Sequence, residues 1–161
     1  MNTVVFPGSF DPVTNGHIDL LIRASRLAER VIVAVAVNTS KRTLFSLEER
    51  CALLEEVTAE IPGIEVIPFS GLLADFASEY KAQALIRGIR GATDADYEMQ
   101  LAQVNRSLNP RLETLLLPAS AGTGFISSTI VKEVFKHQGD INAFAPLCVA
   151  QALFRKQAAN S

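Results

Sequence analysis

The turn Thr14-Asn15-Gly16-His17, near the start of the chain, carries residues whose types and spacing suit the binding of a phosphate group. It ends a tight loop, residues 7–16, which contains two glycines and two prolines and leads onto a predicted helix. A helix N-terminus offers unpaired N–H groups and about half a positive charge, which attract anions. Gly16 would let a phosphate approach the backbone closely, Ser9 adds a hydroxyl, and the His17 imidazole can point at the phosphate. The alternative is a capping loop with a surface histidine.

Two arginines, each followed by glycine, lie in the segment Arg87-Gly88-Ile89-Arg90-Gly91. Arginine makes paired hydrogen bonds to phosphate, and glycine permits close approach of the backbone. Structural ion pairs with Asp94, Asp96 or Glu98 are the alternative. Glu98 and Asn105 are two helical turns apart and share a helix face, which either lines a pocket floor or is simply solvated.

Three consecutive hydroxyl residues, Ser127-Ser128-Thr129, open another predicted helix, and this is more than a helix cap needs. Lys132 lies in the first turn, where a cation opposes the helix dipole unless an anion binds nearby. The segment therefore predicts a second phosphate site, against the alternative of an accidental serine-rich cap. Lys41 or Arg42 could reach a further phosphate, or the two could be a solvated pair.

The elements that must position these groups alternate along the chain. Short apolar runs predict strands at residues 3–6, 31–37, 64–68, 84–87 and 113–117. Helix-period segments predict helices at residues 16–29, 46–59 behind a Ser46 capping box, 72–80, 94–109 capped by Asp94, 127–137 capped by Ser127 or Ser128, and a last helix ending at Leu153 with a frayed tail.

This alternation predicts an α/β fold: a doubly wound, Rossmann-like, five-stranded parallel sheet with helices on both faces and C-terminal helices. We expect one domain spanning residues 1–161. Ligands of such folds bind outside the carboxyl ends of the strands, where the groups above are placed. No acidic cluster with metal spacing and no paired nucleophile and base is evident in the sequence. The constellation therefore suits in-line transfer, in which the protein positions the reactants and neutralises charge developing on phosphorus.

Composition narrows the class of protein. The 161 residues carry a net charge of -2, which argues against a general nucleic-acid binder. No apolar run approaches the roughly 20 residues that span a bilayer, and the start does not resemble a signal peptide, so we expect a cytoplasmic protein without membrane contact. Cys51 and Cys148 lie in apolar helical patterns, which predicts packing roles for both.

Taken together, these motifs resemble a known superfamily. The turn at 14–17 and the run Ile126-Ser127-Ser128-Thr129-Ile130-Val131-Lys132 are similar to the T/H-x-G-H and ISSTxx(K/R) signatures of nucleotidyltransferases. Within that superfamily the chain resembles the phosphopantetheine adenylyltransferase family. The residues that carry this second resemblance lie in segments 7–17, 87–90, 97–100, 105–106 and 132–133.

The resemblance implies transfer of the adenylyl group of ATP to 4'-phosphopantetheine, giving dephospho-CoA and pyrophosphate in coenzyme A biosynthesis. It also implies Mg2+, no metal ligands from the protein, a cytoplasmic location and a homohexamer. His17, Lys41 and Arg90 would be catalytic, and 4'-phosphopantetheine would contact Ser9, Lys41, Leu73 and Arg87. The nucleotide would contact Ser9, Phe10, His17, Gly88, Ile89, Arg90, Glu98, Thr123, Gly124, Phe125, Ile126, Ser127, Ser128 and Thr129.

Two departures from the family are visible. Ser9 stands where the family often has threonine, which keeps the hydroxyl, and residues 119–124 lack the aromatic residue often found before the Phe-Ile-Ser-Ser run. Two other functions are compatible with parts of the pattern. The first is nucleotidyl transfer to another phosphorylated acceptor, such as nicotinamide mononucleotide, or a cytidylyltransferase. The second is a nucleotide- or CoA-sensing module without catalysis, which would not need to keep His17, Lys41 and Lys132.

Overall fold

Five parallel strands form one sheet in the computed structural model, which describes residues 1–37, 39 and 42–160. The strands are β1 (Thr3–Gly8), β2 (Arg30–Ala36), β3 (Ile64–Phe69), β4 (Ala84–Ile89) and β5 (Glu113–Pro118), in the spatial order β3-β2-β1-β4-β5. In register, Val4 lies beside Val31 on one side and beside Ala84 on the other. The strand order reverses at β1, and the switch point between β1 and β4 is where such folds bind ligands.

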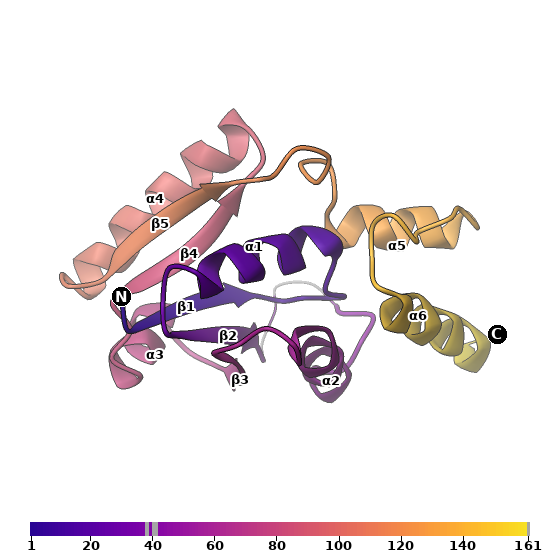
Figure 1. Cartoon of the computed structure of the whole chain (residues 1–161), viewed down its shortest axis with the longest axis horizontal. Coiled ribbons are helices and arrows are strands. Elements are labelled where there is room, and N and C mark those ends of the chain that lie inside the picture. Colours follow the sequence, from indigo (N-terminus) through magenta and orange to yellow (C-terminus); the bar gives the residue numbers. More distant parts are fainter. Residues whose placement is uncertain (38, 40–41, 161) are drawn as a thin grey trace.

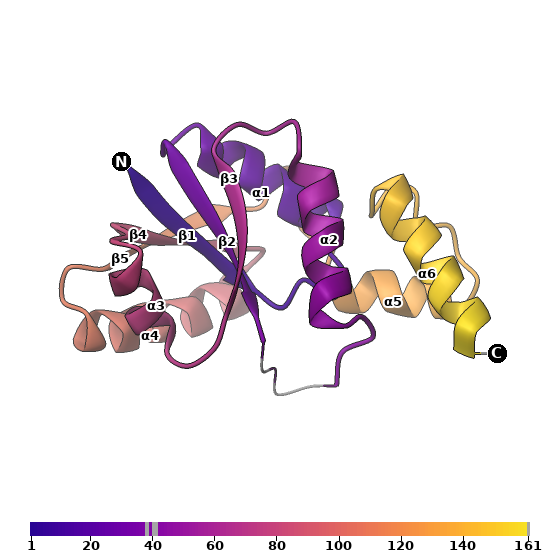
Figure 2. The same cartoon turned by 90° about the horizontal axis from the view of Figure 1, so that it is seen from below.

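Helices cover both faces of the sheet, as predicted. They are α1 (Asn15–Ser25), α2 (Leu47–Thr58), α3 (Leu73–Glu79), α4 (Ala92–Leu108), α5 (Ser128–Lys136) and α6 (Leu147–Asn160). Figure 2 shows α1 and α2 on one face and α3 and α4 on the other. Figure 1 shows α5 and α6 beyond the end of the sheet toward which β1 runs. The C-terminal helices therefore extend the wall of the molecule at the carboxyl ends of the strands.

Alternating side chains of the strands supply two apolar cores. Val4 and Phe6 belong to the core under α1 and α2, and Val5 belongs to the core under α3. Strand β2 contributes to both cores and is buried at each of residues 31–35, as a central parallel strand must be. Cys51 and Cys148 pack against the first core, which confirms the packing roles predicted for them.

The observed helix starts and ends confirm most of the predicted helix boundaries and caps and correct three of them. Ser46 forms the predicted capping box, and Ser127 caps α5. Asp94 does not cap α4, which begins at Ala92, because its carboxylate instead accepts from the N–H of Arg90. Helix α1 ends at Ser25 rather than at residue 29, and the chain then turns, with the N–H of Arg26 donating to the Arg23 carbonyl and that of Leu27 to the Ala24 carbonyl.

The third correction concerns the C-terminus, where α6 continues to Asn160 rather than fraying after Leu153. Lys156 forms an ion pair with Glu49 of α2 at 2.7 Å, and Phe154 packs edge-on against Phe135. These contacts lie beyond Leu153 and hold the last turns against the rest of the fold. They join segments far apart in sequence, so helical periodicity alone does not reveal them.

Within the part of the chain that the structure describes, no helix is both long enough and apolar enough to cross a membrane.

Candidate active site

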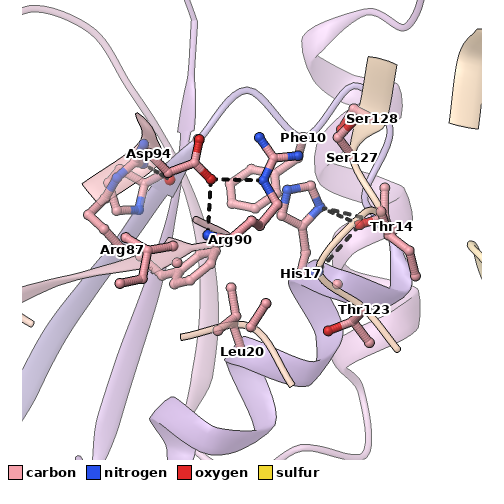
Figure 3. Close-up of a pocket in the computed structure, with 18 of the residues that line it drawn as sticks. Phe10, Thr14, His17, Leu20, Arg87, Arg90, Asp94, Thr123, Ser127 and Ser128 are labelled. Atoms are coloured by element: carbon pink, nitrogen blue, oxygen red, sulfur yellow. Dashed lines mark hydrogen bonds and ion pairs between the residues drawn. The ribbon is translucent and has the colours of Figure 1, made fainter. Parts of the chain in front are cut away.

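Two cavities open at the carboxyl ends of the strands and share one wall. The first cavity, of about 310 Å³, lies between the β1–α1 loop, the end of β4 and the start of α5. The second cavity, of about 250 Å³, lies between the ends of β1 and β2, α3 and α4. The residues that line both are Pro7, Gly8, Ser9, Arg87 and Glu98. Figure 3 shows how side chains from these elements surround the first cavity.

Most residues singled out from the sequence line one of these cavities. The first cavity brings together Ser9, Phe10, His17, Arg87, Gly88, Ile89, Arg90, Glu98, Thr123, Ile126, Ser127 and Ser128. Leu73 and Asn105 line the second cavity, with apolar neighbours that include Phe69 and Leu101. Gly124, Phe125 and Thr129 line neither cavity. Lys41 lies outside the described residues.

His17 is fixed by a reciprocal capping arrangement with Thr14. The Thr14 backbone N–H donates to Nδ1 of His17 at 3.0 Å, and the His17 backbone N–H donates to the Thr14 hydroxyl at 3.3 Å. Because Nδ1 accepts a hydrogen bond, a neutral ring carries its proton on Nε2. Figure 3 shows the ring at the wall of the cavity with Nδ1 turned to Thr14. His17 is therefore prepared to act as a hydrogen-bond donor.

The charge state of His17 is set by its surroundings. Burial, followed by the positive charges of Arg87 and Arg90, lowers the pKa of the imidazole from 6.5 to about 4. Near neutral pH the ring is uncharged, so Nε2 donates without titrating. The ring of Phe10 also packs edge-on against His17, with centroids 5.0 Å apart. These contacts hold the imidazole in one orientation before any ligand binds.

Phe10 itself adopts an unusual backbone conformation. Its φ of 51° lies in the left-handed region that side chains seldom enter, and its ring is 2% exposed. The ring folds back over Gly8, where a Cβ atom would lie 3.0 Å from it. A strained backbone conformation persists only where the surrounding packing holds it in place, and such conformations are found mostly in functional loops.

The two arginines line the first cavity and also make the ion pairs named as the alternative. Arg87 donates from Nε and Nη2 to the two carboxylate oxygens of Glu98, each at 2.8 Å, and from Nη1 to the Pro7 carbonyl. Arg90 pairs with Asp94 at 2.9 Å, and its side chain is 45% exposed. Arg87 is therefore anchored as part of the shared wall, whereas the side chain of Arg90 is placed to turn toward a ligand.

Lys132 forms an ion pair with an anionic side chain of the protein itself, which the sequence alone does not indicate. Its ammonium lies 3.0 Å from the carboxylate of Asp11, and Lys132 lines neither cavity. Asp11 also accepts from the N–H groups of Leu44 and Phe45, each at 2.9 Å. Asp11 thus ties the β1–α1 loop to α5 and to the segment before α2. The sequence alone does not reveal this role of Asp11, because its partners are far apart along the chain.

Leu20 lines the first cavity, although the sequence did not indicate it. A Cβ atom on Gly88 would lie 2.4 Å from Cδ1 of Leu20, so any larger residue here would force the Leu20 side chain to move. The pairing could not be inferred from either segment alone. It gives Gly88 a packing role in addition to the role expected of it at the cavity.

The loop after β5 is held by α1 rather than by an aromatic side chain. Ser120 donates to the carboxylate of Asp19 at 2.7 Å, and Arg23 donates to the Pro118 carbonyl at 2.7 Å. Ala119 and Thr123 of this loop line the first cavity. Phe125 is 57% exposed and packs edge-on against Phe144, away from the cavity lining.

The described residues contain no group of three or more histidine, cysteine or acidic side chains that could hold a metal ion. The acidic side chains lining the first cavity, Asp94 and Glu98, are engaged by arginines. The formal charges of the two arginines and the two carboxylates cancel, but the lining is rich in hydrogen-bond donors: the guanidinium groups, the His17 imidazole and the serine and threonine hydroxyls. It is suited to bind phosphate groups and to stabilise charge that develops during their transfer.

Comparison with known proteins agrees with this geometry. A family model described as cytidylyltransferase-like matches residues 5–134, which include most of β1, the other four strands, the β1–α1 loop and most of α5. The "putative nicotinate-nucleotide adenylyltransferase" of Vibrio parahaemolyticus shares the fold, with a TM-score of 0.71 at 16% identity over 96% of this chain and 93% of that chain. Fold and site therefore define a nucleotidyltransferase.

Relatives of higher sequence identity show which family of nucleotidyltransferases the chain resembles. A phosphopantetheine adenylyltransferase of Psychromonas ingrahamii is 76% identical over 161 residues, covering 100% of each chain. One from Actinobacillus pleuropneumoniae is 52% identical over 155 residues, 96% of this chain and 98% of the relative. The chain belongs to the phosphopantetheine adenylyltransferase family.

Proposed function

We propose that this chain transfers the adenylyl group of ATP to 4'-phosphopantetheine, forming dephospho-CoA and pyrophosphate in coenzyme A biosynthesis. The observation that carries the proposal is the pair of cavities that meet at Ser9 and Arg87. One cavity is lined by the signature turn and the α5 start, and the other has an apolar wall. Two substrates that react phosphate to phosphate need such adjoining sites, and the close relatives named above bear this activity in their name.

In the reaction, an oxygen of the 4'-phosphate attacks the α-phosphorus of ATP in line with the bond to the β-phosphate. That bond breaks, and pyrophosphate leaves with the electron pair. His17 donates from Nε2 to a non-bridging oxygen of the α-phosphate, where negative charge develops. The acceptor phosphate is already ionised, so no general base is required. Positioning and neutralisation of charge supply the catalysis.

ATP would occupy the first cavity, with Arg90 and the N-terminus of α5 near its phosphates. Arg90 is the side chain best placed to reach the leaving pyrophosphate, because it is the more exposed of the two arginines. Lys41 is proposed as a further catalytic cation on the strength of the family resemblance alone.

The 4'-phosphopantetheine would occupy the second cavity. Its phosphate would lie at the shared wall near Ser9 and Arg87, and its arm would run over Phe69 and Leu73. The apolar lining suits a thioethyl-amide chain that carries no charge. Asn105 offers an amide near the same cavity for the polar groups of the arm.

Mg2+ would enter with the nucleotide as MgATP. Mg2+ commonly binds substrate phosphates and water with few protein ligands, which fits a site whose carboxylates are held by arginines. Its positive charge would assist departure of pyrophosphate. We also place the enzyme in the cytoplasm, where the resemblance puts the pathway.

A homohexamer is the proposed assembly. Helix α4 supports it, because Tyr97, Met99, Val104 and Leu108 are each more than half exposed on this one helix, at 60%, 53%, 54% and 51%. Exposed apolar side chains in such number are typical of protein interfaces. Light scattering on the purified chain tests the assembly, and a monomeric mass would refute it.

The function is tested by following pyrophosphate release from ATP with three acceptors in parallel: 4'-phosphopantetheine, nicotinamide mononucleotide and none. Release with 4'-phosphopantetheine alone is expected. Release with nicotinamide mononucleotide alone would favour the alternative transferase. Binding of ATP without release under any condition would indicate a non-catalytic module.

A further inference from the structure

Arg50 of α2 is buried although it carries a charge. Its side chain is 3% exposed, and Nη1 donates to the carbonyl of Ser9 at 2.8 Å and to the carbonyl of Ala36 at 3.0 Å. Nε is also buried, and it has no hydrogen-bond partner within the part of the chain that the structure describes. Among residues 1–37, 39 and 42–160, no carboxylate forms an ion pair with Arg50.

Stability alone does not explain why the Arg50 guanidinium is buried. Burying a charge without a counter-charge is unfavourable, and so is a buried donor without an acceptor. An apolar side chain of similar volume would avoid both. Unsatisfied groups of this kind are rare in proteins, and natural sequences depart from the rules of packing mainly where function requires it.

The two carbonyl groups that Arg50 contacts identify that function. Ser9 follows β1 and lines both cavities, and Ala36 ends β2 and lines the second cavity. One guanidinium nitrogen therefore joins the backbone just beyond β1 to the end of β2, behind the wall that the two cavities share. Ser9 is next to Phe10, whose left-handed backbone needs external support.

We propose that Arg50 is a positioning residue that fixes the Ser9 segment as the common wall of the two substrate sites. The inference rests on the proposed function, and it assigns Arg50 no contact with substrate. Loss of the Arg50 guanidinium should let the Ser9 segment shift, and both sites should weaken together. A residue that only stabilised α2 would leave both sites unchanged in the folded protein.

The test compares Arg50→Met with Thr58→Val. Thr58 is a matched control, because it is a buried polar residue of the same helix whose hydroxyl donates to the Leu54 carbonyl and which lines neither cavity. Thr58→Val should have a lower Tm, whereas Arg50→Met should keep or raise the Tm, because it removes a buried charge that has no counter-charge. At a temperature where both are folded, Arg50→Met should raise the KM for ATP and for 4'-phosphopantetheine by about tenfold each, while Thr58→Val keeps wild-type values.

Wild-type KM values for both substrates in Arg50→Met would overturn the proposal. If Arg50→Met does not fold, Arg50→Gln carries the same comparison, because a neutral and shorter amide cannot hold both carbonyls. If the wild-type chain shows no turnover with 4'-phosphopantetheine, the proposed function fails instead. The role of Arg50 is then decided by calorimetry with ATP, where weaker binding in the Arg50 variant alone supports it and equal binding refutes it.

Discussion

Acidification should destabilise the folded chain through His17. The pKa of its imidazole is about 4 in the folded state, against 6.5 for the ordinary residue, mainly because the ring is buried. Between these two values the unfolded chain binds a proton that the folded chain does not. The contribution of His17 to the free energy of unfolding is therefore fully present above about pH 6.5 and is lost as the pH falls toward about 4.

The size of this effect follows from the difference between 6.5 and about 4, which corresponds to at most about 3 kcal/mol. The ring lines a cavity that opens to solvent, and water there will relieve part of the penalty. We therefore expect His17 to contribute about 1–2 kcal/mol to the loss of unfolding free energy over this pH window.

The measurement is urea unfolding of the wild-type chain and of His17→Gln at several pH values across the window. Glutamine cannot titrate, and at this position of a capping box its side chain can still accept from the Thr14 N–H. The wild-type chain should lose about 1–2 kcal/mol more than the variant on acidification. Equal losses in the two proteins, or an NMR titration of the His17 ring near its ordinary pKa, would show that the folded state does not lower the pKa of His17.

Three substitutions test other parts of the site. Replacing His17 with alanine should lower kcat at least about 100-fold with a modest rise in the KM for ATP, and equal losses in binding and rate would make it a ground-state ligand only. Gly88→Ala should reduce stability by about 1–3 kcal/mol in thermal unfolding, whereas Gly124→Ala, whose added Cβ would have Ala119 as its nearest neighbour at 3.9 Å, should be neutral. Glu98→Gln should lower unfolding free energy by about 2 kcal/mol, because it strands a partly buried guanidinium, and Asp94→Asn at the more exposed pair by under about 1 kcal/mol. Similar losses in these last two variants would contradict the difference in burial.

Local signals in the sequence were sufficient to predict the fold. The apolar runs predicted all five strands to within two residues at each end. In the central strands β1 and β2 the run is continuous because they are buried on both faces, and the edge strands β3 and β5 keep enough apolar residues to be recognised although they are only partly buried. The capping box at Ser46 and the cap at Ser127 marked helix starts for the same local reason. The topology then placed the post-strand loops at one edge, so most predicted site residues line the two cavities.

Features that depend on contacts between distant segments were not predictable. The position of Lys132 in α5 correctly indicated a nearby anion, but Asp11, more than a hundred residues earlier in the chain, supplies it. Arg50 sits in a charged stretch that suggests a solvated helix face, yet it is buried behind Ser9. In each case the sequence shows the chemistry of the side chain, whereas the partner is defined only by the tertiary structure.

The most direct test of the central claim follows the α-phosphorus of ATP. ATP labelled at that atom is incubated with the chain, MgCl2 and 4'-phosphopantetheine, and the products are separated. We expect the label to appear in dephospho-CoA and the pyrophosphate to be unlabelled. Label that remains in ATP or ADP, or a pantetheine product that has gained phosphate without the adenylyl group, would contradict this expectation.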